Sequence, residues 1–298
     1  MSNVSHNDSQ TGGLPAAESR RTHFVDTQPV TTKTVNTLDN PFSRFGIKHL
    51  SATSMLQFRN DPALGIVYLV LGIREAGSPA MHRGTAVDEA IGSLLTQSTE
   101  PDLNQLKRTA TNKYRALIES DPEHFNGRYV EQELRVLLRC LDVCFPLMCS
   151  WEQPSAYQKE IYLQIDGIEV PIRGFIDLLY PSEVRELKST VKPKREITED
   201  HAFQVSTYAM AIQQETGEWP EACVDYITPD SLQSYALDNV EAQAREVVDT
   251  ASKIRTLLAA AKDESALRKS VQPDFSRWIW KYRPQSKRAA MEFFIRGV

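Results

Sequence analysis

The chain has 298 residues, of which 41% are hydrophobic and 24% charged, as in an ordinary soluble protein with one large domain or two small ones. No apolar run approaches the roughly 18 residues of a membrane-spanning helix, and the first residues lack the charged and apolar parts of a secretory signal. The net charge of −5 excludes a uniformly basic, DNA-coating surface, so any contact with nucleic acid must use local basic patches.

The first half of the chain predicts helices that follow a polar tail. Residues 1–42 are rich in Ser, Thr, Asn and Gln, a composition typical of disorder. Order is expected to begin near Ile47, and either Ser51 or Thr53 can cap a first helix. Apolar side chains at helical spacing predict helices over residues 52–61, 62–73 and 81–97, and a helical insertion over about 100–150 that is broken near Asp121.

Three of the four cysteines, Cys140, Cys144 and Cys149, lie close together within the insertion. Their spacing could serve a metal, but the segment is apolar and helical, and Cys140 and Cys144 fall on one helix face. Free buried cysteine is common in protein cores. We therefore expect core packing and a reducing, cytoplasmic compartment.

The second half of the chain predicts a sheet. Residues 157–166 alternate apolar and polar side chains as a strand does, Gly167 turns the chain, and residues 170–180 return as the second strand of a hairpin. Further expected elements are strands over 183–190 and 222–229, an amphipathic helix over 201–217 and a long helix over about 238–262. Together these elements predict one α/β domain over residues 43–265.

The most informative segment is a second hairpin, in which the strand that ends at Tyr180 turns at Pro181-Ser182 into the strand over 183–190. It carries Asp177, Glu186 and Lys188. Residues two apart on a strand point to the same side, so Glu186 and Lys188 share a face, and the hairpin brings Asp177 beside them. Asp177 follows an apolar run, and a buried acid is costly unless it is paired or bound to a metal. Two carboxylates and an ammonium suit a hard divalent cation next to a phosphodiester and its attacking water. The alternative is an ordinary solvated strand face, where Glu-x-Lys is common.

Basic side chains gather in two places. The first cluster directly follows the strand with Glu186 and consists of Lys192, Lys194 and Arg195. The second is the segment 266–298, which holds eight Lys or Arg against two acidic residues and interleaves them with aromatic rings. Such a mixture suits single-stranded nucleic acid, whose bases stack on rings, although an element that covers the core with alternate aromatics shows the same pattern. The nucleic-acid contacts expected here are Trp278, Lys281 and Arg283.

Taken in order, these motifs resemble the RecB-like branch of the PD-(D/E)XK nuclease superfamily over about residues 47–230. HLSATSMLQFRNDP resembles the family's first helix, RGTAVDEAIGSLL its G-x-x-V-H helix, and GFIDLLY the strand that holds the first acid. ELKST matches the (D/E)-x-K strand, and the segment from Gln204 to Tyr208 matches the Q-x-x-x-Y helix. The resemblance implies a restriction-endonuclease-like α/β core, with a central mixed sheet flanked by helices and an N-terminal helical region.

The resemblance also implies a metal centre on the hairpin. Asp177, Glu186 and the backbone carbonyl of Leu187 would be metal ligands, and Lys188 would polarise the attacking water and steady the phosphate charge. The expected ion is Mg²⁺, with Mn²⁺ as the second choice. Carboxylates that close together repel each other, so at least one pKa should be raised in the empty site.

Asp88 departs from the family pattern, because it stands where the helix usually carries a metal-binding His. A carboxylate oxygen serves Mg²⁺ at least as well as imidazole does, so Asp88 is expected to bind metal; the alternative is a helix-surface acid. A second departure is the sequence Asn60-Asp61-Pro62, which occupies the place of Cys-Pro in relatives with an iron–sulfur cluster. No iron–sulfur cluster is expected.

Two further helix positions and one strand position belong to the implied site. Gln204 and Tyr208 lie one turn apart, and in the family they line the site and contact nucleic acid or the catalytic strand. Without the other motifs, they favour a helix packed on the sheet with its polar edge in water. Glu160 on the first strand is either an acid near the site, as in relatives, or a solvated strand residue.

The implied activity is phosphodiester hydrolysis by a metal-dependent DNA exonuclease, in recombination, repair or phage DNA processing. The expected partner is DNA with single-stranded or free ends, with no membrane contact and with any protein partner left open. One alternative is a single-strand or structure-specific endonuclease. Another is a non-catalytic DNA-binding recombination accessory protein with a decayed nuclease fold, against which the intact set of Asp177, Glu186 and Lys188 argues.

Overall fold

The computed structural model describes residues 40–297, so the predicted tail over residues 1–42 lies almost entirely outside the described part. The side chain of Asn40 caps helix α1 (Pro41–Arg44) by accepting hydrogen bonds from two backbone N–H groups. Phe42 is fully buried in the main core. The folded part therefore begins several residues earlier than Ile47, where the sequence predicted its start.

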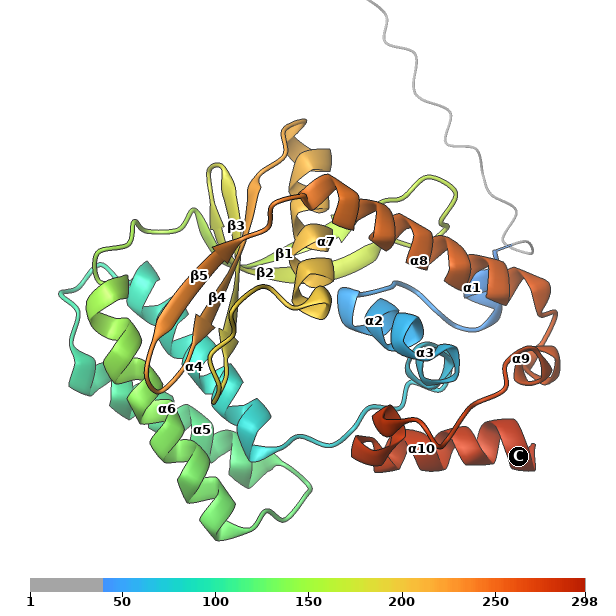
Figure 1. Cartoon of the computed structure of the whole chain (residues 1–298), viewed down its shortest axis with the longest axis horizontal. Helices are drawn as coiled ribbons and strands as arrows, with labels where there is room; N and C mark the ends of the chain where they lie inside the picture. The colour runs from blue at the N-terminus through green and yellow to red at the C-terminus, as the bar shows by residue number, and fades with distance from the viewer. Residues whose placement is uncertain (1–39, 298) are drawn as a thin grey trace, which may run out of the picture. The chain divides into compact units, whose positions relative to one another are not determined.

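A five-stranded mixed sheet forms the centre of the fold (Figure 1). Its strands lie side by side in chain order, as β1 (Ala156–Leu163), β2 (Ile172–Tyr180), β3 (Glu183–Ser189), β4 (Glu221–Ile227) and β5 (Leu232–Ala236). Neighbours are antiparallel except β3 and β4, which run parallel and are joined by helix α7 (Glu199–Thr216). This arrangement confirms the predicted fold class, while β5 was not anticipated.

Helices cover both faces of the sheet (Figure 1). One layer consists of α4 (Pro79–Thr96), α5 (Leu103–Ser120) and α6 (Gly127–Met148), and the other is built mainly from α2 (Ala52–Asn60), α7 and α8 (Val240–Ala260). Cys140 and Cys144 are buried in the first layer as expected, whereas Cys149 is exposed. All four cysteines are free thiols.

The residues on either side of Asp177 in strand β2 are buried in different hydrophobic cores. The preceding Ile176 belongs to the core beneath α7, whereas the following Leu178 belongs to the core beneath α4 and α6. The ladder between β2 and β3 runs only from Leu178, opposite Arg185, to the turn, and the rest of β3 pairs with β4 alone. The two strands therefore part at Asp177, which leaves its carboxylate in the gap between them.

Local signals explain where the helices around this gap begin and end. Ser51, rather than Thr53, caps α2 and forms a capping box with Ser54. Thr198 caps α7, and Gly217 ends that helix at a φ of 86°, a left-handed conformation that glycine adopts readily.

Helix α4 is anchored to both the sheet and the helical insertion through the buried Arg83. Its guanidinium pairs with Glu133 of α6 and donates to the hydroxyl and the carbonyl oxygen of Ser189, at 3.3 and 3.1 Å. A buried guanidinium requires such partners, because an unpaired buried charge is strongly unfavourable. This link fixes α4, and with it Asp88, against the end of β3.

The C-terminal elements pack against the rest of the domain. They comprise α9 (Glu264–Ser270), a 3₁₀ turn η1 (Trp278–Tyr282), α10 (Pro284–Ala290) and a final π turn η2 (Met291–Arg296). Ile279 and Trp280 are buried against Leu64 and Val67 of α3 (Pro62–Leu69). Of the aromatic residues in this segment, Trp280 therefore packs in the core, whereas Trp278 and Tyr282 are 70% and 66% exposed.

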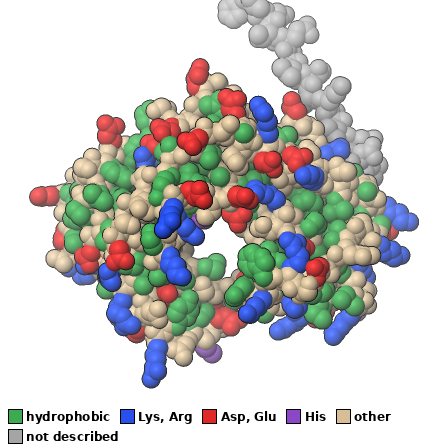
Figure 2. Space-filling model, in the orientation of Figure 1, with side chains coloured by type: hydrophobic (Ala, Val, Ile, Leu, Met, Phe, Trp, Pro, Cys, Tyr) green, Lys and Arg blue, Asp and Glu red, His purple; other side chains and the backbone are tan. Residues whose placement is uncertain are grey.

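An opening is visible at the centre of the described part (Figure 2). In this view α4 lies on one side of it, α2 and α3 on the other, and α10 opposite the sheet (Figure 1). Side chains of both charges lie at its rim (Figure 2). Among residues 40–297, no helix combines the length and the apolarity that a bilayer-crossing segment requires.

Candidate active site

Three acidic side chains converge where β2 and β3 part. Asp88 comes from α4, Asp177 from β2 and Glu186 from β3. Glu186 is 3% exposed, and the amide of Gln158 bridges Asp88 and Asp177. The structure therefore brings together the three carboxylates that the sequence predicted as metal ligands.

Asp88 and Asp177 are both held by neutral donors. The Asp88 Oδ2 atom accepts from the Tyr157 hydroxyl at 3.1 Å and from Gln158 Nε2 at 3.0 Å. Asp177 accepts from Gln158 Nε2 and from the Leu187 backbone N–H, both at 2.8 Å. Tyr157, Gln158 and Leu187 thus fix two acids whose negative charges would otherwise drive them apart.

Glu186, Lys188, Gln204 and Tyr208 form one hydrogen-bonded group. Glu186 Oε1 accepts from Lys188 Nζ and, at 2.8 Å, from Gln204 Nε2. Lys188 Nζ also donates to Gln204 Oε1 at 3.0 Å, and Gln204 Nε2 donates to the Tyr208 hydroxyl at 3.0 Å. The amide of Gln204 therefore orients both members of the Glu-x-Lys pair. Gln204 is thus more than a solvent-facing residue on the polar side of a packed helix.

Two carboxylate oxygens in this group have no hydrogen-bond partner. They are Asp88 Oδ1 and Glu186 Oε2, both buried. A buried carboxylate oxygen without a partner is rare and energetically costly, and oxygen atoms of this kind are the ligands that Mg²⁺ and other hard cations prefer. The donor set of Asp88, Asp177 and Glu186 therefore fits a hard divalent cation.

The same residues have perturbed proton affinities. Burial, followed by the nearby charge of Asp177, raises the pKa of Glu186 to about 8 and that of Asp88 to about 7. Burial also raises the pKa of Asp177. For Lys188, burial acts to lower the pKa, but the attraction of Glu186 acts the other way and the net pKa is raised. The predicted rise in carboxyl pKa is present, and its largest cause is the desolvation of the buried carboxylates rather than their mutual repulsion.

A cleft of about 340 Å³ opens onto Asp177, which is among its lining residues while Asp88 and Glu186 are not. Gln158 and Tyr208 line the cleft together with Asp177. The rest of the lining comes from β2 and from the start of α2 with the residues before it, and includes His49, Ser51, Thr53, Arg173 and Phe175. The Phe175 side chain is 43% exposed, so an aromatic ring is available to a ligand beside the carboxylates.

Tyr157 and Gln158 are site residues that the sequence did not indicate. Gln158 lies two residues before Glu160, the β1 residue that the sequence indicates as a possible site acid. Glu160 is exposed, and its carboxylate accepts from Arg173 and Tyr162 rather than pointing at the other acids. No sequence signal marks Gln158, because its orientation depends on an irregularity of β1.

The predicted role of the Leu187 carbonyl as a ligand remains a prediction. The structure assigns other contacts to this residue: its N–H binds Asp177, and its side chain is buried in the core with α4 and α6.

The basic loop after β3 lies directly beyond the site. Lys192 and Arg195 are exposed, and Lys194 is half-buried, with its carbonyl accepting from the Tyr235 hydroxyl at 2.8 Å. The C-terminal candidates are distributed differently, since Trp278 and Lys281 are exposed while Arg283 is half-buried. Contact of either group with nucleic acid remains a prediction.

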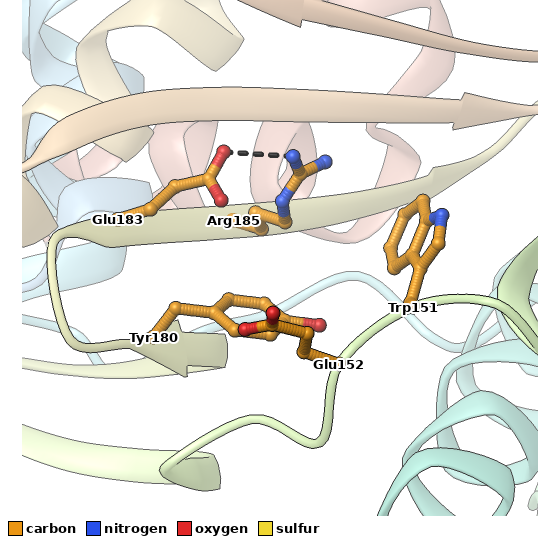
Figure 3. Close-up of a pocket in the computed structure, with 5 residues that line it drawn as sticks. All are labelled: Trp151, Glu152, Tyr180, Glu183 and Arg185. Carbon is orange, nitrogen blue, oxygen red and sulfur yellow. Dashed lines mark ion pairs between the residues drawn. The ribbon is translucent and has the colours of Figure 1, made fainter.

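A second acidic group lies elsewhere on the sheet. One oxygen each of Glu183 and Glu221 and the sulfur of Cys223 lie within 4.8 Å of one another. Glu183 lines a pocket of about 250 Å³ and is ion-paired with Arg185 at 2.8 Å (Figure 3), and Arg185 stacks over Trp151, 4.8 Å from the ring centre. Burial raises the pKa of Cys223, which disfavours the thiolate that binds metals. This group is less suited to a cation than the Asp88 group.

Comparison with known proteins identifies the family. A model of the PD-(D/E)XK nuclease superfamily matches residues 49–282, which include every acid of the site. The chain belongs to the PD-(D/E)XK nuclease superfamily. Members of this superfamily are metal-dependent nucleases, and DNA is the substrate that the family implies. Within the matched range, Glu186-Leu187-Lys188 has the form (D/E)-x-K, and Asp177 precedes it.

A solved structure supports the same fold. The crystal structure of a protein named "Putative exonuclease", from Eubacterium rectale, matches with a TM-score of 0.51 and 13% identity, over 83% of this chain and 90% of that chain. The structure of SSO0001 matches with a TM-score of 0.32 and 15% identity, over 63% of this chain and 95% of that one, too low a score to support a fold assignment. No curated protein matches the chain in sequence at a significant level.

Proposed function

We propose that this nuclease is a Mg²⁺-dependent DNA exonuclease of the RecB-like branch. The observation that carries the metal site is the pair of buried, unpartnered oxygens Asp88 Oδ1 and Glu186 Oε2 beside Asp177. Residues 40–297 offer three carboxylates and two amide side chains at this point but no histidine or cysteine in contact with them. An all-oxygen donor set favours Mg²⁺ and also accepts Mn²⁺, whereas softer ions prefer nitrogen or sulfur.

In this proposal each residue has a distinct task. Asp88, Asp177, Glu186 and the Leu187 carbonyl hold the cation, which when bound supplies Lewis-acid activation of a water molecule and neutralises charge on the phosphate. Lys188 places its ammonium beside Glu186, where it can orient the water and stabilise the negative charge that develops on the phosphate. The roles of Gln204 and Tyr208 follow from their contacts.

Gln204 holds both Lys188 and Glu186 in position, because its amide donates to the carboxylate and accepts from the ammonium. Tyr208 lines the cleft, and burial raises its pKa, so its hydroxyl stays protonated and can donate to a phosphate oxygen. These two residues therefore connect the acids to the cleft in which a DNA strand would lie.

The preference for single strands or free ends is supported by the surroundings of the acids. The cleft is lined by an aromatic ring, Phe175, and by Arg173, a combination that suits unpaired bases and their backbone. The similarity to the Eubacterium rectale protein, which is named an exonuclease, and the order of the motifs agree with end-dependent cleavage.

We further propose action in recombination, repair or phage DNA processing, in a cytoplasmic compartment. The four free cysteines are compatible with a reducing environment.

Cleavage of matched DNA substrates tests the proposal. Wild type is incubated with end-labelled linear and with circular DNA, each single- or double-stranded, in Mg²⁺, Mn²⁺ or EDTA. We expect loss of linear single strands in Mg²⁺ or Mn²⁺, no reaction in EDTA, intact circles, and no activity in Asp177→Asn. Cleavage of circular single strands would show that the enzyme is an endonuclease and not a strict exonuclease. If none of the substrates is cleaved in a metal-dependent way, the proposal is refuted.

A further inference from the structure

The backbone of β1 is irregular at Gln158. Its φ is 52°, and it is the one non-glycine residue with positive φ among residues 40–297. In the ladder with β2, Tyr157 pairs with Leu178 and Lys159 pairs with Ile176, so the register is unbroken and places Gln158 opposite Asp177. Neither strand has an inserted residue, so the irregularity is a distorted backbone at the position that faces one of the three acids.

The positive φ of Gln158 has an energetic cost that the rest of the structure must offset. A left-handed backbone is unfavourable for a residue with a Cβ by about 1–2 kcal/mol, and such strain persists mainly where a site depends on it. Glycine would adopt this φ without strain. The presence of Gln at this position therefore indicates that its side chain is required.

The side chain of Gln158 reaches two of the three acids at once. Its Nε2 atom lies 3.0 Å from Asp88 Oδ2 and 2.8 Å from Asp177 Oδ1. Both partners are acceptors when ionised, so the amide nitrogen rather than the amide oxygen must face them. The two N–H groups thus connect a ligand on α4 with a ligand on β2, two residues that are 89 positions apart in the chain.

The contacts of Gln158 leave a metal-facing oxygen free. The amide occupies Asp88 Oδ2, which also accepts from Tyr157, while Asp88 Oδ1 remains buried and unpartnered. On the other carboxylate, Gln158 takes Oδ1 of Asp177 and Leu187 takes Oδ2. Each acid is therefore fixed in orientation through a neutral donor, before any cation arrives.

We propose that Gln158 is a positioning residue of the metal site, which holds the carboxylates of Asp88 and Asp177 in the orientation that a divalent cation needs. The inference rests on the proposed function and adds a residue to it. A neutral amide suits this task, because a lysine there would repel the cation and a glutamate would add a fourth negative charge to a buried group. Donors of this kind around metal ligands typically contribute about 10- to 100-fold in affinity.

Two substitutions separate the side chain from the backbone. Gln158→Gly removes the amide and relieves the strain of the positive φ, so its thermal midpoint should equal or exceed that of wild type. Gln158→Leu removes the amide but keeps a side chain of similar size on the same backbone. The matched control is Glu160→Gln, two residues along β1, whose exposed side chain contacts Arg173 and none of the three acids.

Binding of Mn²⁺ to the DNA-free protein, measured by titration calorimetry, provides a readout other than activity. We expect both Gln158 variants to bind Mn²⁺ about 10- to 100-fold more weakly than wild type, and Glu160→Gln to bind it within about twofold. Cleavage by the Gln158 variants should recover partly as the Mn²⁺ concentration is raised, since the ligands themselves remain.

The outcomes distinguish this inference from the proposed function. If wild type binds Mn²⁺ and cleaves DNA, but Gln158→Gly binds Mn²⁺ as tightly as wild type, the positioning role is overturned and the nuclease proposal stands. A lower thermal midpoint with unchanged Mn²⁺ affinity would make Gln158 a purely structural residue and would likewise overturn the inference. If wild type neither binds Mn²⁺ nor cleaves DNA, the proposed function fails and the inference fails with it.

Discussion

Replacing Lys188 with methionine should abolish most of the cleavage activity while leaving DNA binding nearly intact. Lys188 Nζ contacts Glu186 and lies 3.0 Å from Gln204 Oε1, so the ammonium is held at the centre of the site. Methionine retains most of the apolar stem and removes the charge. The substitution therefore tests the ammonium rather than the packing of the side chain.

The expected size of the effect follows from the electrostatics of a half-buried charge. A phosphate that gains one negative charge about 4 Å from the ammonium is stabilised by about 4 kcal/mol at an effective dielectric constant of about 20. Since about 1.36 kcal/mol corresponds to a tenfold change in rate, the loss is about a thousandfold. Removal of one oxyanion donor in other enzymes costs a similar factor, about 10²–10³.

Single-turnover cleavage of an end-labelled single strand at saturating Mg²⁺ measures this rate. DNA affinity is measured in parallel by fluorescence anisotropy in EDTA, and Lys253→Met, on the exposed side of α8, serves as the matched control. Activity of Lys188→Met within fivefold of wild type would refute the assignment. Loss of DNA binding in step with activity would show that the ammonium binds the strand and does not act in the chemical step.

Further predictions concern protonation and DNA contact. Burial raises the pKa of Glu186 from 4.5 to about 8, so in metal-free protein the stability contributed by its protonated form is complete below about pH 4.5 and is lost as pH rises through 8. Thermal unfolding in EDTA should show this loss in wild type and a smaller loss in Glu186→Gln, in which Asp88 and Asp177, whose pKa values burial also raises, remain. Alanine at the exposed Trp278 or Tyr282 should weaken single-strand binding by about 1–3 kcal/mol in an anisotropy titration if a base stacks there. Trp280→Ala should instead lower the stability to urea by about 3–5 kcal/mol, because Trp280 is 1% exposed.

The two successive hairpins of β1, β2 and β3, and the acids Asp177 and Glu186 on them, could be predicted because local patterns determine them. Alternation along residues 157–180 and the turn at Gly167 fix the pairing, and the observed register confirms it. Short-range spacing then places Glu186 and Lys188 together, and their contact in the structure agrees. Asp88 required the order of the family motifs, because nothing local to α4 indicates that it meets β2.

The features that the sequence did not reveal arise from tertiary packing. The left-handed φ of Gln158 has no compositional signal, since glycine and asparagine are the residues that usually mark such a position. Strand β5 was missed because its five residues are short and mostly half-buried or exposed, with weak alternation. The early start at Phe42 was hidden because an isolated aromatic in a polar segment gives no periodic pattern.

The buried contact between Arg83 and Glu133 bears on how far this enzyme could be reduced in size. Helices α5 and α6 resemble a detachable insertion in the chain order, yet α6 supplies the carboxylate that neutralises a guanidinium holding α4 to Ser189. Excision of residues 103–148 would leave Arg83 with an uncompensated charge and would expose the apolar surface of α4 that the insertion covers. A minimal nuclease cut from this chain would therefore have to retain the insertion or redesign α4, so the two segments form one indivisible module.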